Sequence, residues 1–220
     1  MHGGVLRNGQ QMTDVRRVGS GSSAFWHLGF QDGSALQAGT VVNATGAWGD
    51  EFAARFDAAP VGLLPKRRSA FTFRAPEGLD LKTLALVSAV DETYYFKPDA
   101  GRLLGSPANA DDSFAHDVRP EELDIAMGIH EIQQASHLVV GRPLSTWAGL
   151  RSFVPDGELV IGWDNAREGF FWLVGQGGYG IQSAAGASEL AAALLLGTAL
   201  SENLLEQGVQ STQMAVLRLR

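Results

Sequence analysis

Arg151 is the first side chain of this sequence that could do chemistry, because it is a charged group in apolar surroundings. It lies between Trp147 and Phe153, and a guanidinium in such a setting needs an anionic partner. That partner is either a structural carboxylate of the chain or the carboxylate of a substrate. The sequence around Arg151 leaves both alternatives open.

Arg68 and Tyr95 are weaker candidates when each is considered singly. Arg68 ends the basic run Lys66-Arg67-Arg68 ahead of an apolar strand, and such a run is usually a solvent-exposed edge. Tyr94 and Tyr95 alternate in a strand-forming stretch, so one of them faces the interior. A tyrosine there is usually a core residue whose hydroxyl is hydrogen-bonded.

A glycine-rich turn between a strand and a helix is the second feature that could bind a ligand. The apolar run Phe170 to Val174 has the composition of a buried strand. Glycines follow at positions 175, 177, 178 and 180, and the Ala- and Leu-rich stretch 184–196 predicts a helix. This order directs free backbone N–H groups and the positive end of the helix dipole toward one place. The alternative is a tight connection that binds nothing.

Composition and motif searches exclude several classes of function. The chain has no cysteine, which excludes disulfides, catalytic thiols and cysteine-linked cofactors. Its histidines show no HExxH spacing, so no metal site is expected, and no Gly-x-Ser-x-Gly elbow indicates a hydrolase. The net charge of −7 argues against nucleic acid as a partner. No apolar run reaches the ~18 residues that a transmembrane segment needs, so a cytoplasmic protein is expected.

The secondary structure that must position these residues is expected to change in type along the chain. Residues 1–40 predict short strands, with a hairpin turn at 31–34, and residues 50–56 predict a short helix. Residues 61–107 predict an antiparallel sheet that includes strands at 84–89 and 93–96. A helix from Pro120 to Leu138 follows, with acidic residues in its first turn. Strands at 143–153 and 159–162 precede the glycine-rich turn, and a polar, fraying tail is expected at the end.

Three motifs together resemble a known family. Residues 41–48 (VVNATGAW), 147–151 (WAGLR) with 155–157 (PDG), and 175–181 (GQGGYGI) occur in this order. They resemble the D-amino-acid oxidase superfamily of FAD-dependent amine oxidoreductases. Within it, residues 67–71, 95–101 and 103–110 look closest to the bacterial D-arginine dehydrogenases. The resemblance covers essentially the whole chain.

The resemblance implies an oxidoreductase that uses FAD to take a hydride from the α-carbon of a D-amino acid. It implies that Arg68 and Arg151 pair with the substrate carboxylate, that Tyr95 adds its hydroxyl, and that the Gly178 carbonyl accepts a hydrogen bond from the substrate amine. No side chain is assigned as catalytic. The residues that the resemblance assigns to FAD are Ala44, Thr45, Gly46, Trp48, Gly175, Gly177, Gly178, Tyr179, Gly180, Ile181 and Gln182.

One departure from the family pattern concerns the cofactor. The family begins with a strand, a Gly-x-Gly-x-x-Gly turn and a helix that bind the FAD diphosphate. Residues 19–24 have this spacing with Ala24 in the third position, but no buried strand precedes them and a hairpin follows. The chain is therefore expected to start partway through the family fold. One hypothesis is that a separate N-terminal FAD-binding section is its partner.

The expected fold class is α+β, with an antiparallel substrate-domain sheet inserted into the remainder of a Rossmann-like FAD-binding α/β domain. Residues 1–60 and 154–220 are expected to form the partial FAD-binding domain, and residues 61–153 the substrate-binding domain. The edge near residues 41–44 is expected to be incompletely covered. Two alternatives to the D-amino-acid dehydrogenase remain: a non-catalytic remnant without FAD, and an oxidase of glycine or N-methylated amino acids such as sarcosine.

Overall fold

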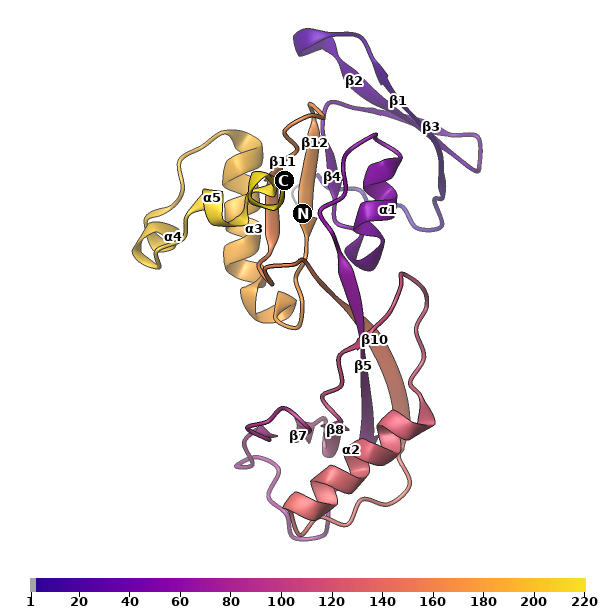
Figure 1. Ribbon diagram of the computed structural model, residues 1–220, viewed down its shortest axis with the longest axis vertical. Helices are drawn as coiled ribbons and strands as arrows, with labels where there is room; N and C mark the ends of the chain where they lie inside the picture. Colours follow the sequence, from indigo (N-terminus) through magenta and orange to yellow (C-terminus); the bar gives the residue numbers. More distant parts are fainter. Residues whose placement is uncertain (1–2) are drawn as a thin grey trace. The chain divides into compact units, whose positions relative to one another are not determined.

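The computed structural model describes residues 3–220, apart from the side chain of Ser22, and divides into two compact units. The first consists of residues 1–63 with 153–220, and the second of residues 64–152. Each unit is an α/β arrangement that contains antiparallel strand pairs (Figure 1). The assignment of one unit to FAD and of the other to substrate remains a prediction.

The first unit contains two three-stranded sheets. One is an antiparallel meander of β1 (Met12–Val18), β2 (Phe25–Phe30) and β3 (Ala35–Ala38). The other has the order β11 (Val160–Trp163), β12 (Phe170–Val174) and β4 (Val41–Asn43), with β12 antiparallel to β11 and parallel to β4. Within the described residues β4 is an edge strand, and Val42 is 39% exposed.

Strand β12 is buried on both faces, as its uninterrupted apolar sequence predicts. Phe170 and Trp172 pack with Phe56, which follows the helix α1 (Gly49–Ala54). Phe171 points to the other face and packs against Leu190 of the helix α3 (Gly180–Leu196). The sheet therefore lies between helices on both sides (Figure 1).

The prediction of a polar, fraying C-terminal tail is wrong. Residues after Gly197, which ends α3 in the left-handed conformation, form the short helices α4 (Glu202–Glu206) and α5 (Ser211–Met214) and the 3-10 turn η3 (Val216–Leu219). Leu204 and Val216 are buried. Arg220 donates to the buried carboxylate of Asp164 at 2.7 Å. Burial of sparsely spaced apolar residues fixes this segment, although its local sequence is polar.

The second unit is a sheet of order β10-β5-β8-β7-β6, with β9 paired to β5. The strands are β5 (Leu64–Phe73), β6 (Val87–Ser88), β7 (Tyr95–Asp99), β8 (Arg102–Ser106), β9 (Asp111–Asp112) and β10 (Ser145–Phe153). The strand expected at 84–89 is only the two residues of β6, and the strand expected at 93–96 begins at Tyr95.

Helix α2 (Glu122–Ala135) covers one face of this sheet (Figure 1). It is shorter than the expected 120–138, because Pro120 and Glu121 precede it and the backbone becomes extended at Ser136. Ile125 and Ile132 pack against Phe71, Phe73 and Leu103. Gly105 is required here, since a Cβ at this position would lie 2.8 Å from the Phe71 ring and 2.9 Å from Ile132.

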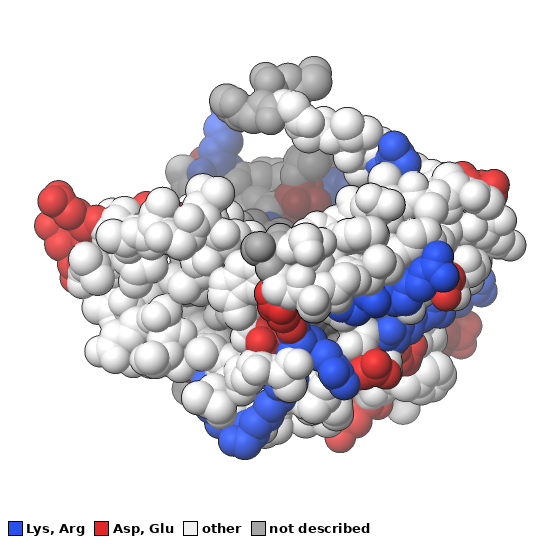
Figure 2. All heavy atoms as spheres, turned by 90° about the horizontal axis from the view of Figure 1, so that it is seen from above, with Lys and Arg blue, Asp and Glu red and all other residues white. Residues whose placement is uncertain are grey.

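Charge and hydropathy set limits on the surface. Among residues 3–220 no helix has the length and apolarity needed to cross a bilayer. On the face seen in Figure 2, basic and acidic side chains are interspersed among uncharged ones rather than gathered in a single basic field.

Candidate functional site

Arg68, Tyr95 and Arg151 lie on one face of the second unit's sheet, opposite α2. Arg67 and Ser69 on β5 both bond Asp124 of α2, so Arg68 between them points to the other face. Tyr95 precedes Phe96, which belongs to the core under α2. On β10, Ser145 Oγ lies 2.6 Å from Thr72 Oγ1, so Arg151, six residues later, shares the face of Thr72 and Arg68.

Strand order brings these three residues together. Arg68 is on β5, Arg151 is on the neighbouring β10, and Tyr95 is on β7 with only β8 between it and β5. Burial of the guanidinium and the nearby charge of Arg151 lower the pKa of Arg68, while Tyr95 and Glu92 act in the opposite direction. Two cations this close together form a place where an anion is favoured.

The structural alternative for Arg151 lacks support in the part of the chain that is described. There, no carboxylate lies within ion-pair distance of Arg151 or of Arg68. The Arg68 Nε–H donates to the carbonyl oxygen of Asn109 at 2.5 Å, and Tyr95 is a side-chain partner of Arg68 that raises its pKa. The terminal N–H groups of both arginines are therefore suited to a carboxylate from outside.

Arg67, by contrast, is a structural residue, and its assignment to a solvent-exposed edge is wrong. Its side chain is 17% exposed and forms ion pairs with Asp111, Glu121 and Asp124. The acidic first turn of the helix at Pro120 was the sequence signal that could have identified these partners. What was missing was the pairing of β9 with β5, which places Asp111 opposite Arg67.

In the first unit, two turns lie at the same edge of the sheet. Strands β4 and β12 are parallel, with Asn43 opposite Trp172, so the segments that follow them emerge side by side. The buried Asn43 side chain donates to Gly49 O at 2.8 Å and accepts from Thr45 Oγ1 at 2.8 Å. These bonds fix residues 44–48, where Gly46 has a positive φ of 59° and Trp48 is 41% exposed.

The second turn leads from Gly175 to Gln182 at the start of α3. Its predicted cofactor residues lie in sequence here, with Gly178 and Tyr179 directly before the helix. No acidic residue occupies the first turn of α3 and no side chain caps it, so its N–H groups suit an electron-rich ligand. The Tyr179 hydroxyl donates to Gly157 O, and burial raises the pKa of Tyr179.

Gly177 is the position in this turn where a side chain is least tolerated. Its φ is +53°, and a Cβ there would lie 2.7 Å from the Phe153 ring. Gly177→Ala should lower the free energy of unfolding by about 2–4 kcal/mol, from left-handed strain and the ring contact together. Urea unfolding measures the change, with Gly197→Ala as the matched control, since Gly197 has φ +64° and nothing within 4 Å of its Cβ position. Equal losses in both variants would show that the ring contact is unimportant.

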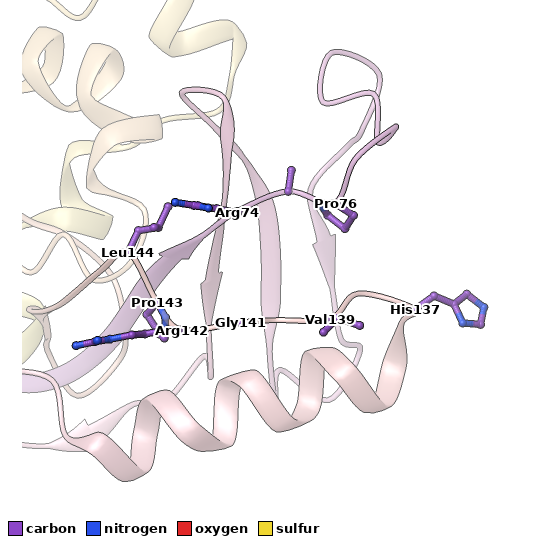
Figure 3. Close-up of a pocket in the computed structure, with 9 residues that line it drawn as sticks. Arg74, Pro76, His137, Val139, Gly141, Arg142, Pro143 and Leu144 are labelled. Carbon is purple, nitrogen blue, oxygen red and sulfur yellow. The ribbon is translucent and has the colours of Figure 1, made fainter.

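One cavity of the second unit is lined by none of Arg68, Tyr95 and Arg151. It has a volume of about 660 Å³ and is lined by residues that include Arg74, His137, Val139, Arg142 and Leu144. Figure 3 shows His137 and Arg142 at opposite ends of the row of lining residues. Its charged groups do not converge on one ligand position. In the described chain no group of three or more acidic or histidine residues could hold a metal ion.

The Gly19–Ala24 pattern is a hairpin connection. It joins β1 to the antiparallel β2 through a single 3-10 turn at Gly21–Ser23. A dinucleotide fingerprint needs a strand that leads into a helix. Residues 44–48 and 175–182 are therefore the remaining candidates for FAD. They lie at one sheet edge, where no side chain caps the start of α3, and their assignment to FAD stays a prediction.

Comparison with known proteins identifies a family and several solved structures to which this chain is similar. The family described as FAD dependent oxidoreductase (DAO) matches residues 1–194. Glycine oxidase from Geobacillus kaustophilus has 25% identity and a TM-score of 0.70, with 90% of this chain and 50% of that chain covered. L-α-glycerophosphate oxidase from Mycoplasma pneumoniae, solved with FAD bound, has 16% identity and a TM-score of 0.70, covering 85% and 50%.

A third similar structure is iminodiacetate oxidase from Chelativorans sp. BNC1. It has 19% identity and a TM-score of 0.71, with 91% of this chain and 52% of that chain covered. At this identity the likeness concerns the fold alone. The chain spans about half the length of the solved structures that it matches.

Proposed function

This chain belongs to the DAO family of FAD-dependent oxidoreductases, whose cofactor is FAD, and on that premise we propose that it oxidises D-amino acids. One observation carries the proposal. Arg68, Arg151 and Tyr95 share one sheet face, and in the described chain no carboxylate lies within ion-pair distance of either arginine. A substrate carboxylate supplies the missing charge.

Each residue has a defined task in this proposal. The guanidinium groups of Arg68 and Arg151 bind the substrate carboxylate through charge-assisted hydrogen bonds, and the Tyr95 hydroxyl donates a further one. The carbonyl oxygen of Gly178 accepts an N–H of the substrate amine.

The cofactor segments complete the arrangement. FAD, when bound, would supply the acceptor for the hydride from the α-carbon. Residues 44–48 would hold the diphosphate part of FAD, and the N–H groups at the start of α3 would stabilise negative charge on its ring. The imino acid then reacts with water to give a keto acid and ammonia. No side chain of this chain is needed as an acid or base in that last step.

Substrate class is the second part of the proposal. Residues 67–71, 95–101 and 103–110 favour a D-arginine dehydrogenase-like enzyme. The alternative is oxidation of glycine or an N-methylated amino acid, which the likeness to a glycine oxidase favours. Both substrates carry the same α-carboxylate, so the arginine pair serves either. The third alternative is a protein of this family that does not bind FAD.

The test is the absorbance spectrum of the purified chain with added FAD, followed by anaerobic D-arginine, glycine and sarcosine in parallel. We expect flavin to remain bound after gel filtration, and D-arginine to bleach its visible band. If only glycine or sarcosine bleached the band, the proposed substrate would be glycine or an N-methylated amino acid in place of a D-amino acid. A chain that is folded by circular dichroism but retains no flavin would contradict the catalytic proposal and favour the non-catalytic alternative.

A further inference from the structure

Asn109 connects Arg68 to a buried polar network behind the sheet. Its backbone oxygen accepts the Arg68 Nε–H at 2.5 Å, and its side-chain Oδ1 accepts the Ser69 N–H at 2.9 Å. Its Nδ2 donates to Asp111 Oδ2 at 2.6 Å and to Asp124 Oδ2 at 3.1 Å. Asn109 therefore bonds the Arg68 side chain through its backbone carbonyl, and bonds Ser69, Asp111 and Asp124 through its side chain.

The network behind Asn109 converges on one carboxylate oxygen of the largely buried Asp124. The Asp124 side chain is 12% exposed, and its Oδ2 also accepts from Ser69 Oγ at 2.7 Å and Arg67 Nε at 3.1 Å. A buried carboxylate with this many donors has one favourable position. Asn109 links this carboxylate to Arg68 on the opposite face, because its side chain bonds Asp124 and its backbone carbonyl bonds Arg68.

The backbone at Asn109 is held in place as well. The preceding residue, Ala108, has a positive φ of 50°, and its N–H donates to Ser106 Oγ at 3.1 Å. Ser106 Oγ in turn donates to Ser69 O at 2.6 Å. An unusual conformation of this kind persists only where its surroundings determine it. The direction of the Asn109 carbonyl is therefore fixed before any ligand arrives.

This contact limits how Arg68 can meet a carboxylate. A guanidinium offers two bidentate edges, one formed by Nε and Nη2 and one formed by Nη1 and Nη2. Because Asn109 O occupies the Nε–H, only the Nη1/Nη2 edge remains for both oxygens of a carboxylate. Arg151, the like-charged neighbour, lies near enough to lower the pKa of Arg68, so a carboxylate at that edge meets both cations.

We propose that Asn109 is a positioning residue that holds Arg68 so that its Nη1/Nη2 edge receives the substrate carboxylate. The inference rests on the proposed function, in which Arg68 binds that carboxylate. It adds that Asn109 positions Arg68 and that the Nη1/Nη2 edge of Arg68 makes the contact. Its effect is on ligand affinity: a misdirected Arg68 binds carboxylate less well, while the electron transfer that follows is unchanged.

The experiment uses the full chain, Asn109→Ala, and Ser69→Ala as the matched control. Ser69→Ala removes a bond to the same buried Asp124 Oδ2 but keeps every contact of Asn109, including the Ser69 N–H. Two quantities are measured by NMR: the hydrogen-exchange rate of Arg68 Nε–H without ligand, and the dissociation constant of acetate, the simplest carboxylate probe. Arg68→Ala identifies the signal and gives the affinity that remains without this arginine.

We expect Asn109→Ala to speed exchange at Arg68 Nε–H and to weaken acetate binding, each by about 10-fold, the size of one lost hydrogen bond. Ser69→Ala should change neither, whatever its effect on thermal stability. Unchanged exchange in Asn109→Ala, or equal effects in Ser69→Ala, would overturn the positioning role. If Arg68→Ala itself left acetate affinity unchanged, the proposed role of Arg68 would fail and this inference with it. The exchange rates tell the two failures apart.

Discussion

Arg151→Ala is expected to lower affinity for a substrate carboxylate by about 100-fold or more, since a charge-assisted bidentate pair contributes about 3 kcal/mol. Arg151→Lys should recover only part of the loss, because an ammonium is a point charge that cannot present two parallel N–H groups. The measurement is kcat/KM of the FAD-loaded protein with D-arginine, or the acetate dissociation constant where turnover is slow.

The same substitution should not destabilise the fold. Arg151 lowers the pKa of Arg68, so its removal relieves a repulsion between like charges and leaves the free energy of unfolding unchanged or slightly higher. Lower affinity together with undiminished stability is typical of a residue kept for binding.

Arg142→Ala is the matched control for this pair of measurements. Arg142 is an exposed arginine of the same unit that precedes β10 and lines the separate cavity with Arg74 and His137. We expect it to change neither affinity nor stability by a measurable amount. Equal affinities of Arg142→Ala and Arg151→Ala would contradict the carboxylate-binding assignment.

Asp164→Asn is expected to produce the largest loss of stability, about 3–5 kcal/mol, because it breaks a buried ion pair. The Asp164 side chain is fully buried. It accepts hydrogen bonds from Trp172 Nε1 and from the Ala166 and Arg167 N–H groups, each at 2.9 Å, and from Arg220 at 2.7 Å. An amide in its place would turn an N–H₂ group toward some of these donors and leave Arg220 without its counterion.

The pH dependence of this effect follows from the pKa of Asp164. Burial acts to raise that pKa, but hydrogen bonds from Arg220, Trp172 and the Ala166 N–H outweigh burial and hold it below its usual value. A carboxyl whose pKa is lower in the folded state stabilises the fold above its unfolded pKa, near 3.9, and loses this contribution as pH falls through the folded pKa.

Urea unfolding of Asp164→Asn and of the original chain should therefore differ by a constant amount above about pH 5, and the difference should shrink as pH falls below the unfolded pKa toward the folded pKa. The control is Asp156→Asn, since Asp156 pairs with Arg218 but its side chain is 39% exposed. A pair at that exposure contributes about 1 kcal/mol or less. An equal loss in the two variants, or a difference that does not shrink at all between pH 5 and pH 3, would contradict the account.

The sequence by itself determined the local elements that have a strong pattern. The run 170–174 formed a strand buried on both faces, because no polar side chain interrupts it. The residues after it formed a turn and a helix, because the glycines permit positive φ at Gly175 and Gly177 and the Ala- and Leu-rich stretch favours a helix. The family followed from motifs of this kind, whose order along the chain survives without any tertiary information.

Only the tertiary structure decided which distant residues meet. Arg67 and Arg68 are adjacent in the sequence, yet strand alternation sends one into the acidic network of α2 and the other to the opposite face beside Arg151. The C-terminal residues have no strong local pattern, and the buried carboxylate of Asp164 fixes Arg220 across 56 positions of the chain. Long-range pairs such as these are set by strand order and burial, which local propensity does not encode.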